Sequence, residues 1–157
     1  MRYLIAFFIA AVLAPPIFAS ETKSYSVSRS VKIDASAQAV WNVIGDFCDI
    51  DDWHPAFVGC ALKTRDGGGV HRILTLDSGG EFVEKLIATE AGLSYTYSIV
   101  ESPVPLERYT GTLSIAPGNP VEVTWASRFK SADPETEAIV AGFYEAGLAA
   151  LEAHFAK

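Results

Sequence analysis

The sequence EFVEKLIATEAGLSYTYSIV, residues 81–100, contains the clearest structural pattern of the chain. In its second half, apolar side chains alternate with Ser and Thr, which is typical of a β-strand with one buried face. Ala91-Gly92 near its centre permits a tight reversal, because glycine adopts positive φ values that other residues avoid. The stretch therefore predicts two antiparallel strands joined by a hairpin.

The same pattern continues on both sides of this hairpin. Clusters of Gly, Pro, Asn and Ser separate short runs of alternating residues, and connections this short join antiparallel neighbours. We therefore expect a meander of six strands, at residues 58–63, 70–76, 81–88, 93–100, 107–115 and 121–130.

Helical segments flank the meander. Residues 25–33 alternate as a first strand, Asp34-Ala35-Ser36 begins a short helix, and residues 49–53 form one more helical turn. After the meander, Asp133 is the expected N-cap of a long helix with Pro134 at its first position. The apolar stripe expected on this helix consists of Ile139, Phe143, Leu148, Leu151 and Phe155.

This order of elements predicts one α+β domain over residues 20–157. A seven-stranded curved antiparallel sheet surrounds the long C-terminal helix, and two short helices follow the first strand. Such a shape leaves a hollow.

Gly142 and Gly147 lie inside the expected long helix. Each costs about 1 kcal/mol there relative to alanine, so close neighbours are expected to need the space beside them.

Residues 1–19 have the features of a secretory signal peptide. Arg2 precedes eleven apolar residues, and Ala19 ends the segment at the expected cleavage site. Eleven apolar residues are too few to span about 30 Å of hydrocarbon, so no stable membrane anchor is expected after cleavage. We therefore predict a periplasmic or secreted protein.

The acidic composition argues against a nucleic-acid partner. The chain has 12 Lys and Arg against 19 Asp and Glu, a formal net charge of −7 that becomes −8 without Arg2. No basic cluster offsets this charge, so phosphate backbones and anionic membrane surfaces repel the protein.

Cys48 and Cys60 are the two cysteines of the chain. An even number in an exported chain favours a disulfide, and closing a loop of about a dozen residues contributes roughly 2–3 kcal/mol. Two thiols this far apart lack the close spacing of a zinc site. A disulfide is the preferred prediction, and two buried free thiols are the alternative.

Strand parity divides the meander into an apolar and a polar face. Arg72 and Glu84 are exceptions on the apolar face, because buried charges are costly unless they are paired. Either the two residues pair across neighbouring strands, or Glu84 acts with Tyr97 or Tyr109 to orient a polar group of a ligand. A desolvated carboxylate can also be a general base, so Glu84 and Tyr109 are the catalytic candidates.

The histidines do not form a metal site by spacing, and no nucleotide-binding or hydrolase motif occurs. His71 falls on the polar face and His154 lies near the chain end. His54, between Trp53 and Pro55, is expected to pack against or cap the short helix. We expect neither a metal ion nor a cofactor.

Several short segments carry a resemblance to a known superfamily: VWNVIGDF (40–47), WHP (53–55), Cys60, Arg72, EKL (84–86), YSIV (97–100), LERY (106–109) and the helix from Pro134. On these segments, residues 25–156 resemble the START/Bet v 1-like (SRPBCC) superfamily, most closely its bacterial polyketide cyclase/dehydrase and lipid-transport branch. The resemblance implies a helix-grip fold, in which the sheet wraps around the C-terminal helix.

Within that superfamily, the chain is also similar to the plant abscisic acid receptors. Residues 77–80 and 102–106 fall at their gate and latch, but the gate lacks Leu-Pro, and Val58 stands where they have a ligand-binding lysine. The apolar face gives Arg72 and Trp125 as ligand-binding candidates. The resemblance implies further pocket-lining candidates, namely Leu74, Leu76, Glu84, Tyr97, Ile99, Leu106, Tyr109, Ile139 and Phe143.

Three functions are consistent with these observations. The leading hypothesis is an exported binder or carrier of a small hydrophobic molecule held in an internal cavity. The resemblance also implies a cyclase or dehydratase acting on an aromatic or polyketide-like substrate. Finally, the chain resembles the periplasmic accessory protein encoded with bacterial methanol dehydrogenase, which implies a partner protein, such as an oxidoreductase, onto which it docks.

Overall fold

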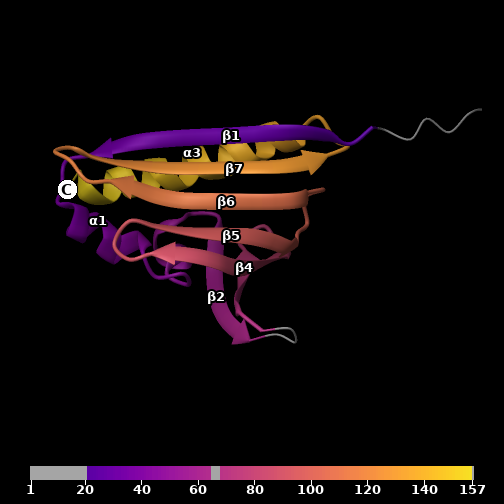
Figure 1. The fold of residues 1–157 in the computed structure, drawn as a ribbon, viewed down its shortest axis with the longest axis horizontal. Coiled ribbons are helices and arrows are strands. Elements are labelled where there is room, and N and C mark those ends of the chain that lie inside the picture. The colour runs from indigo at the N-terminus through magenta and orange to yellow at the C-terminus, as the bar shows by residue number, and fades with distance from the viewer. Residues whose placement is uncertain (1–20, 65–67, 157) are drawn as a thin grey trace, which may run out of the picture.

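The computed structural model describes residues 21–64 and 68–156. The predicted signal peptide, residues 1–19, lies outside the described residues. The elements follow one another in the predicted order (Figure 1): β1 (Lys23–Ile33), α1 (Ala37–Ile44), α2 (Ile50–Trp53), β2 (Phe57–Thr64), β3 (Val70–Leu76), β4 (Glu81–Glu90), β5 (Ser94–Glu101), β6 (Glu107–Ala116), β7 (Val121–Ser131) and α3 (Thr136–Phe155).

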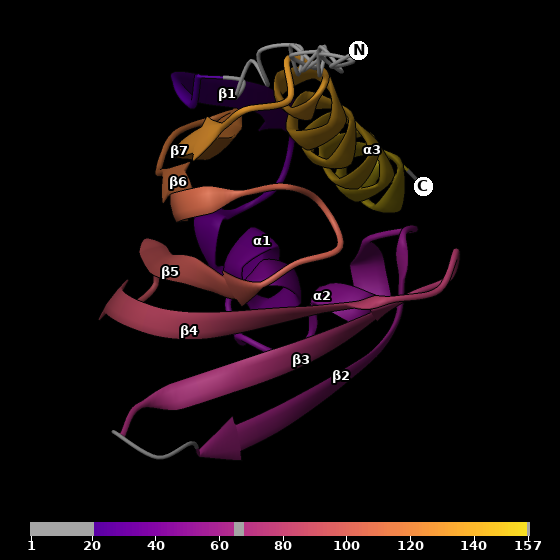
Figure 2. The ribbon, with the colours of Figure 1, turned by 90° about the vertical axis from the view of Figure 1, so that its right-hand side faces the viewer.

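The seven strands form one antiparallel sheet in the order β1-β7-β6-β5-β4-β3-β2. Strands β2 to β7 form the predicted meander, and β1 pairs with β7 along its whole length, from Lys23 opposite Ser131 to Ile33 opposite Val121. The sheet is strongly curved, with β1 and β7 at one end of the curve and β2 and β3 at the other (Figure 2). The predicted fold class, a helix-grip fold with a seven-stranded sheet, is confirmed.

Helix α3 lies beside β1 and β7, and α1 and α2 lie inside the curve of the sheet (Figures 1 and 2). Ser36 is the N-cap of α1, because its Oγ accepts a hydrogen bond from the backbone N–H of Ala39 at 3.2 Å. The core is one cluster that joins the concave face of the sheet to all three helices, and includes Ile44, Leu113 and Leu151. This arrangement places α3 opposite strands β3 to β5.

The start of the long helix differs from the prediction. Helix α3 begins at Thr136, and Glu135 rather than Asp133 is its N-cap residue. Asp133 and Pro134 belong to a turn before the helix. In this turn Ser131 Oγ accepts from the Asp133 N–H, and Asp133 Oδ1 accepts from the Glu135 N–H. These bonds give the backbone N–H groups of Asp133 and Glu135 side-chain partners without helical geometry. The helix therefore starts nearer to the C-terminus than predicted.

The buried face of α3 also differs from the predicted stripe. Leu148 and Leu151 are buried as expected, but Ile139 is 39% exposed and Phe143 and Phe155 are partly exposed. The buried side includes Val140, Tyr144, Leu148 and Leu151. The cause is a stacking contact with the sheet, because the Tyr144 ring lies 4.5 Å from that of Trp125.

His71 differs from the prediction as well. It lies on the outer face of the sheet, but it is buried. In the register, Lys63 and Lys85 are its direct neighbours on β2 and β4, so their long aliphatic stems flank the ring. The His71 Nδ1 atom also makes a 3.2 Å hydrogen bond to the carbonyl of Gly69.

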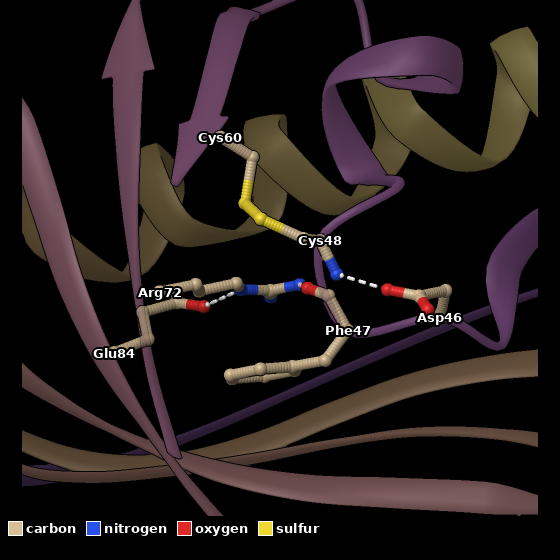
Figure 3. Close-up of a disulfide and its surroundings, with 6 residues drawn as sticks. All are labelled: Asp46, Phe47, Cys48, Cys60, Arg72 and Glu84. Atoms are coloured by element: carbon tan, nitrogen blue, oxygen red, sulfur yellow. Dashed lines mark hydrogen bonds and ion pairs between the residues drawn. A yellow bond between two sulfur atoms is a disulfide. The ribbon is translucent and has the colours of Figure 1, made fainter. Parts of the chain in front are cut away.

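The disulfide prediction is confirmed. Cys48 and Cys60 are bonded, and they join the connection between α1 and α2 to strand β2 (Figure 3). The disulfide therefore ties the short helices to the edge of the sheet.

The two glycines of α3 have opposite surroundings. A Cβ atom on Gly147 would lie 2.4 Å from His54 Cδ2 and 3.1 Å from Trp125 Cζ3, whereas nothing lies within 4 Å of a Cβ on Gly142. The expectation that a close neighbour needs the space is confirmed for Gly147 and wrong for Gly142.

This contrast gives a matched pair of variants. Gly147→Ala lowers the free energy of unfolding by about 1–3 kcal/mol, because overpacking outweighs the gain in helix propensity. Gly142→Ala raises it by about 0.5–1 kcal/mol, because only the propensity changes. Urea unfolding of both variants measures these shifts; equal effects of the two substitutions would contradict the contact with His54.

Candidate ligand-binding site

A cavity lies between α3 and the concave face of the sheet. Its lining is apolar or aromatic except for His54, Glu84 and the hydroxyls of three tyrosines. The cavity volume is about 40 Å³, and a single water molecule needs about 10–15 Å³ by the same kind of measure. The cavity is therefore narrow, and a ligand of more than a few heavy atoms must displace side chains at its edge.

Eight of the eleven ligand-binding candidates line this cavity: Glu84, Tyr97, Ile99, Leu106, Tyr109, Trp125, Ile139 and Phe143. Arg72, Leu74 and Leu76 are buried but do not line it. In the register, Leu74 lies opposite Phe82 and Leu76 opposite Phe57, and these larger side chains line the cavity instead. That the eight residues contact a ligand remains a prediction.

Arg72 and Glu84 form a buried ion pair across β3 and β4, where they are direct partners in the register (Figure 3). Arg72 Nε donates to Glu84 Oε2 at 2.6 Å, and Arg72 Nη1 donates to the carbonyl of Phe47. The guanidinium carbon lies 4.2 Å from the centre of the Phe47 ring. The pairing interpretation is therefore confirmed, and Arg72 also holds the segment next to Cys48.

For both Glu84 and Arg72, burial and pairing shift the pKa in opposite directions. Burial raises the pKa of the Glu84 carboxyl, and the charge of Arg72 opposes this shift. Burial acts to lower the pKa of Arg72, but the carboxylate of Glu84 raises it, and the result lies above the ordinary value. Arg72 thus stays charged, and Glu84 is the group whose protonation responds to its surroundings.

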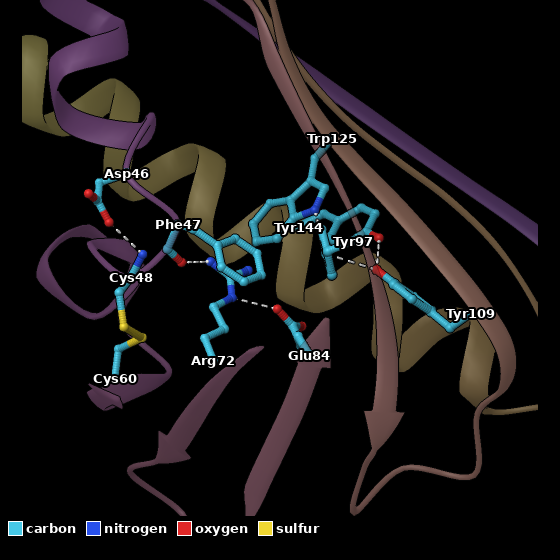
Figure 4. Close-up of polar contacts among 10 residues, drawn as sticks. All are labelled: Asp46, Phe47, Cys48, Cys60, Arg72, Glu84, Tyr97, Tyr109, Trp125 and Tyr144. Carbon is cyan, nitrogen blue, oxygen red and sulfur yellow. Dashed lines mark hydrogen bonds and ion pairs between the residues drawn. A yellow bond between two sulfur atoms is a disulfide. The ribbon is translucent and has the colours of Figure 1, made fainter. Parts of the chain in front are cut away.

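Three tyrosines and one tryptophan form a hydrogen-bonded chain beside this pair (Figure 4). Trp125 Nε1 donates to the Tyr97 hydroxyl at 2.9 Å, the hydroxyls of Tyr97 and Tyr109 are 3.1 Å apart, and those of Tyr109 and Tyr144 are also hydrogen-bonded. Gly111 leaves room for them, since a Cβ there would lie 2.8 Å from both the Tyr97 ring and the Tyr109 oxygen. The tyrosines come from β5, β6 and α3.

Burial raises the pKa of all three tyrosine hydroxyls, that of Tyr144 to about 12. A phenolate loses more hydration free energy on burial than a neutral phenol, so the neutral form is favoured. Tyr97, Tyr109 and Tyr144 are therefore hydrogen-bond donors at neutral pH.

His54 connects the short helix to α3. It is the C-cap residue of α2, which confirms the expectation that it caps the short helix. Its Nδ1 accepts from the backbone N–H of Ala56 at 3.2 Å, so Nε2 carries the proton and donates to the carbonyl of Phe143 at 2.9 Å. Burial lowers the pKa of His54, and the positive charge of Arg72 adds to this effect. The imidazole is therefore neutral in the folded protein.

This lowered pKa predicts a loss of stability in acid. The unfolded chain binds a proton at His54 near its ordinary pKa of 6.5, whereas the folded protein resists it. The contribution of His54 is therefore fully present above about pH 6.5 and is lost as the pH falls below that value. Urea unfolding of wild type and His54→Gln between pH 8 and 5 measures it.

The difference in unfolding free energy between wild type and His54→Gln should shrink as the pH falls. The control is His154→Gln, because His154 is exposed in the last turn of α3. A difference that stays constant over this pH range would show that His54 does not resist protonation.

Seven residues of the cavity lining are not among the predicted ligand-binding residues, and two of these, Tyr144 and His54, carry polar groups. Tyr144 follows the predicted stripe residue Phe143, and the spacing of Val140, Tyr144 and Leu148 is the signal that points to it. His54 was expected only to pack or cap, and nothing in its local sequence indicates the contact with Phe143 across the fold.

No helix in residues 21–64 and 68–156 has the length and apolar character needed to cross a membrane. The same residues contain no group of three or more His, Cys, Asp or Glu side chains arranged to hold a metal ion.

Residues 24–156 match a family described as polyketide cyclase / dehydrase and lipid transport. No curated protein matches the chain.

Solved structures are similar over most of the chain. The protein XoxI from Bacillus cereus has 29% identity and a TM-score of 0.76, with 84% of this chain and 96% of that chain covered. An uncharacterized protein from Bacillus thuringiensis has 30% identity and a TM-score of 0.76, with 85% and 100% covered. A START superfamily protein from Mycobacterium smegmatis shares the fold, with 18% identity, a TM-score of 0.65, and 83% and 97% covered.

Proposed function

The chain belongs to the polyketide cyclase/dehydrase and lipid-transport family, and on that basis we propose that it is an exported protein that binds and carries a small hydrophobic molecule. The observation that carries this proposal is the cavity under α3. Its lining is mostly aromatic and aliphatic, with a few polar groups at defined positions, which is the composition of small-molecule sites.

The edge of the cavity supports entry of a ligand. Ile139 on α3 is 39% exposed, and Val104 and Leu106 in the connection between β5 and β6 are partly exposed. All three line the cavity. Rotation of these side chains widens a site that is narrow without a ligand, so the connection between β5 and β6 is the proposed entrance.

The disulfide supports export, because disulfides persist in oxidising compartments. The sequence adds the predicted signal peptide, and both are compatible with a periplasmic or secreted carrier. Docking onto a periplasmic oxidoreductase remains a prediction.

A cavity-filling variant with a matched control tests ligand binding. Ile99 and Val100 are neighbours on β5, but Ile99 lines the cavity, whereas Val100 does not line it and is half-exposed. Toluene is the probe, followed by ligand-observed NMR. Ile99→Trp should weaken toluene binding at least about tenfold, and Val100→Trp should leave it unchanged.

Native mass spectrometry of the protein purified from its own host measures the mass of any molecule bound to it. The absence of both a copurified molecule and toluene binding would refute the proposal.

A cyclase-type reaction is the second candidate. Glu84, a carboxylate with a raised pKa, shares the cavity with three tyrosine O–H donors. A base and an O–H donor in one apolar site suit proton abstraction next to a carbonyl group. Glu84→Gln should then abolish turnover but preserve binding of the substrate; turnover at the wild-type rate would remove Glu84 from the mechanism.

A further inference from the structure

The tyrosine chain has one more proton than its internal hydrogen bonds use. Tyr97, Tyr109 and Tyr144 supply three O–H protons, and two hydrogen bonds join their oxygens. Trp125 adds a bond in which its own N–H is the donor. Whichever way the two bonds point, one O–H is not used between the three oxygens; it can go to the buried Ser127 hydroxyl beside Tyr144 or to a ligand in the cavity that all three tyrosines line.

Glu84 presents the complementary group. Its Oε2 accepts from Arg72, which is the one hydrogen bond found for this carboxylate among the described residues, so Oε1 can accept another. Within those residues, no hydrogen bond joins Glu84 to the tyrosines, although all four side chains line the same cavity (Figure 4). The Arg72 guanidinium carbon lies 5.3 Å from the centre of the Tyr97 ring, which places the ion pair directly beside the chain.

The residues that line the cavity thus include an acceptor, Glu84 Oε1, and one tyrosine O–H that the chain itself does not use. A carbonyl or ether oxygen would satisfy only the donor, and a primary amine would leave one proton in excess. A hydroxyl group satisfies both, because it donates one hydrogen bond and accepts another. The remaining wall of the cavity is aromatic, with rings of Phe82, Phe143 and Trp125.

We propose that the cavity selects small aromatic molecules with one hydroxyl group, that is phenols, whose O–H donates to Glu84 and accepts from the tyrosine chain. This inference rests on the proposed function and adds the ligand class to it.

Three probes of similar size test the selection. Phenol and toluene have the same number of heavy atoms, but only phenol carries a hydroxyl; anisole accepts a hydrogen bond but cannot donate one. Binding to the purified protein is followed by ligand-observed NMR. Phenol should bind about tenfold more tightly than toluene, with anisole between them, because each added hydrogen bond contributes a modest net gain.

Variants separate the two partners of the hydroxyl. Any single Tyr→Phe change in the chain removes one proton and at least one bond, so a free O–H remains and phenol keeps part of its advantage. Replacing Tyr97, Tyr109 and Tyr144 together by Phe should remove the advantage of anisole over toluene entirely. Glu84→Gln should reduce the preference for phenol over anisole. Tyr25→Phe is the control, because Tyr25 stacks on Phe129 outside the cavity lining.

The outcomes distinguish the two proposals. Equal affinities of wild type for phenol and toluene overturn the selection of phenols but leave the hydrophobic carrier standing. Absence of binding by all three probes overturns the selection of phenols, and together with the absence of any copurified molecule it overturns both proposals. If the triple variant does not fold, the wild-type comparison and Glu84→Gln still decide the question, since a phenol preference unchanged in Glu84→Gln contradicts the role of the carboxylate.

Discussion

Arg72→Met lowers the free energy of unfolding by about 3–5 kcal/mol, because it leaves the buried carboxylate of Glu84 without its partner. The substitution also removes the donor to the Phe47 carbonyl and the contact with the Phe47 ring. Urea unfolding at pH 7 measures the change. The matched control is Arg29→Met, which breaks an exposed pair with Glu145 and costs less than about 1 kcal/mol.

Two further measurements identify the unpaired charge as the cause. The double variant Arg72→Met/Glu84→Leu should recover most of the lost stability, because removing both charges avoids the unpaired one. In Arg72→Met alone, the pKa of Glu84 loses the opposing effect of Arg72 and rises further above its ordinary value. A raised acid pKa favours the folded state below that pKa, so the destabilisation should shrink as the pH falls toward 5. A pH-independent loss would indicate packing as the cause.

Removal of the disulfide by replacing Cys48 and Cys60 with Ala lowers the free energy of unfolding by about 3 kcal/mol, the value for a closed loop of this length. Wild type treated with dithiothreitol should lose a similar amount, whereas the Cys48→Ala/Cys60→Ala variant should not respond to the reductant. A variant as stable as oxidised wild type would show that the bond does not constrain the unfolded chain.

The disulfide and the ion pair should be coupled. Cys48 follows Phe47, whose carbonyl accepts from Arg72, so both features hold one segment against the sheet (Figure 3). A double-mutant cycle between Cys48→Ala/Cys60→Ala and Arg72→Met should therefore give an interaction energy of at least about 0.5 kcal/mol. Strict additivity would mean that the two features act independently.

Much of the fold could be predicted because its signals are local. Alternation in strands such as residues 93–100, the N-cap Ser36 and the turn glycines each act over a few residues, and they agree with one another. The inward-facing parity of Glu84, Tyr97 and Tyr109 placed them correctly on the cavity wall for the same reason. The rotation of α3 was not predicted, because Phe143 and Tyr144 both fit an apolar stripe and only the stack on Trp125 selects between them.

The order of elements, the two faces of the sheet and the pair of cysteines follow from periodicity and composition, so they can be predicted without a structure. Tertiary structure decided which polar groups meet. The tyrosine chain joins β5, β6, β7 and α3, and the bond from His54 to Phe143 joins residues 89 positions apart. Such contacts depend on the curvature of the sheet and the rotation of a helix, which no local pattern encodes, because a side chain's partner across the fold is set by packing of the whole core.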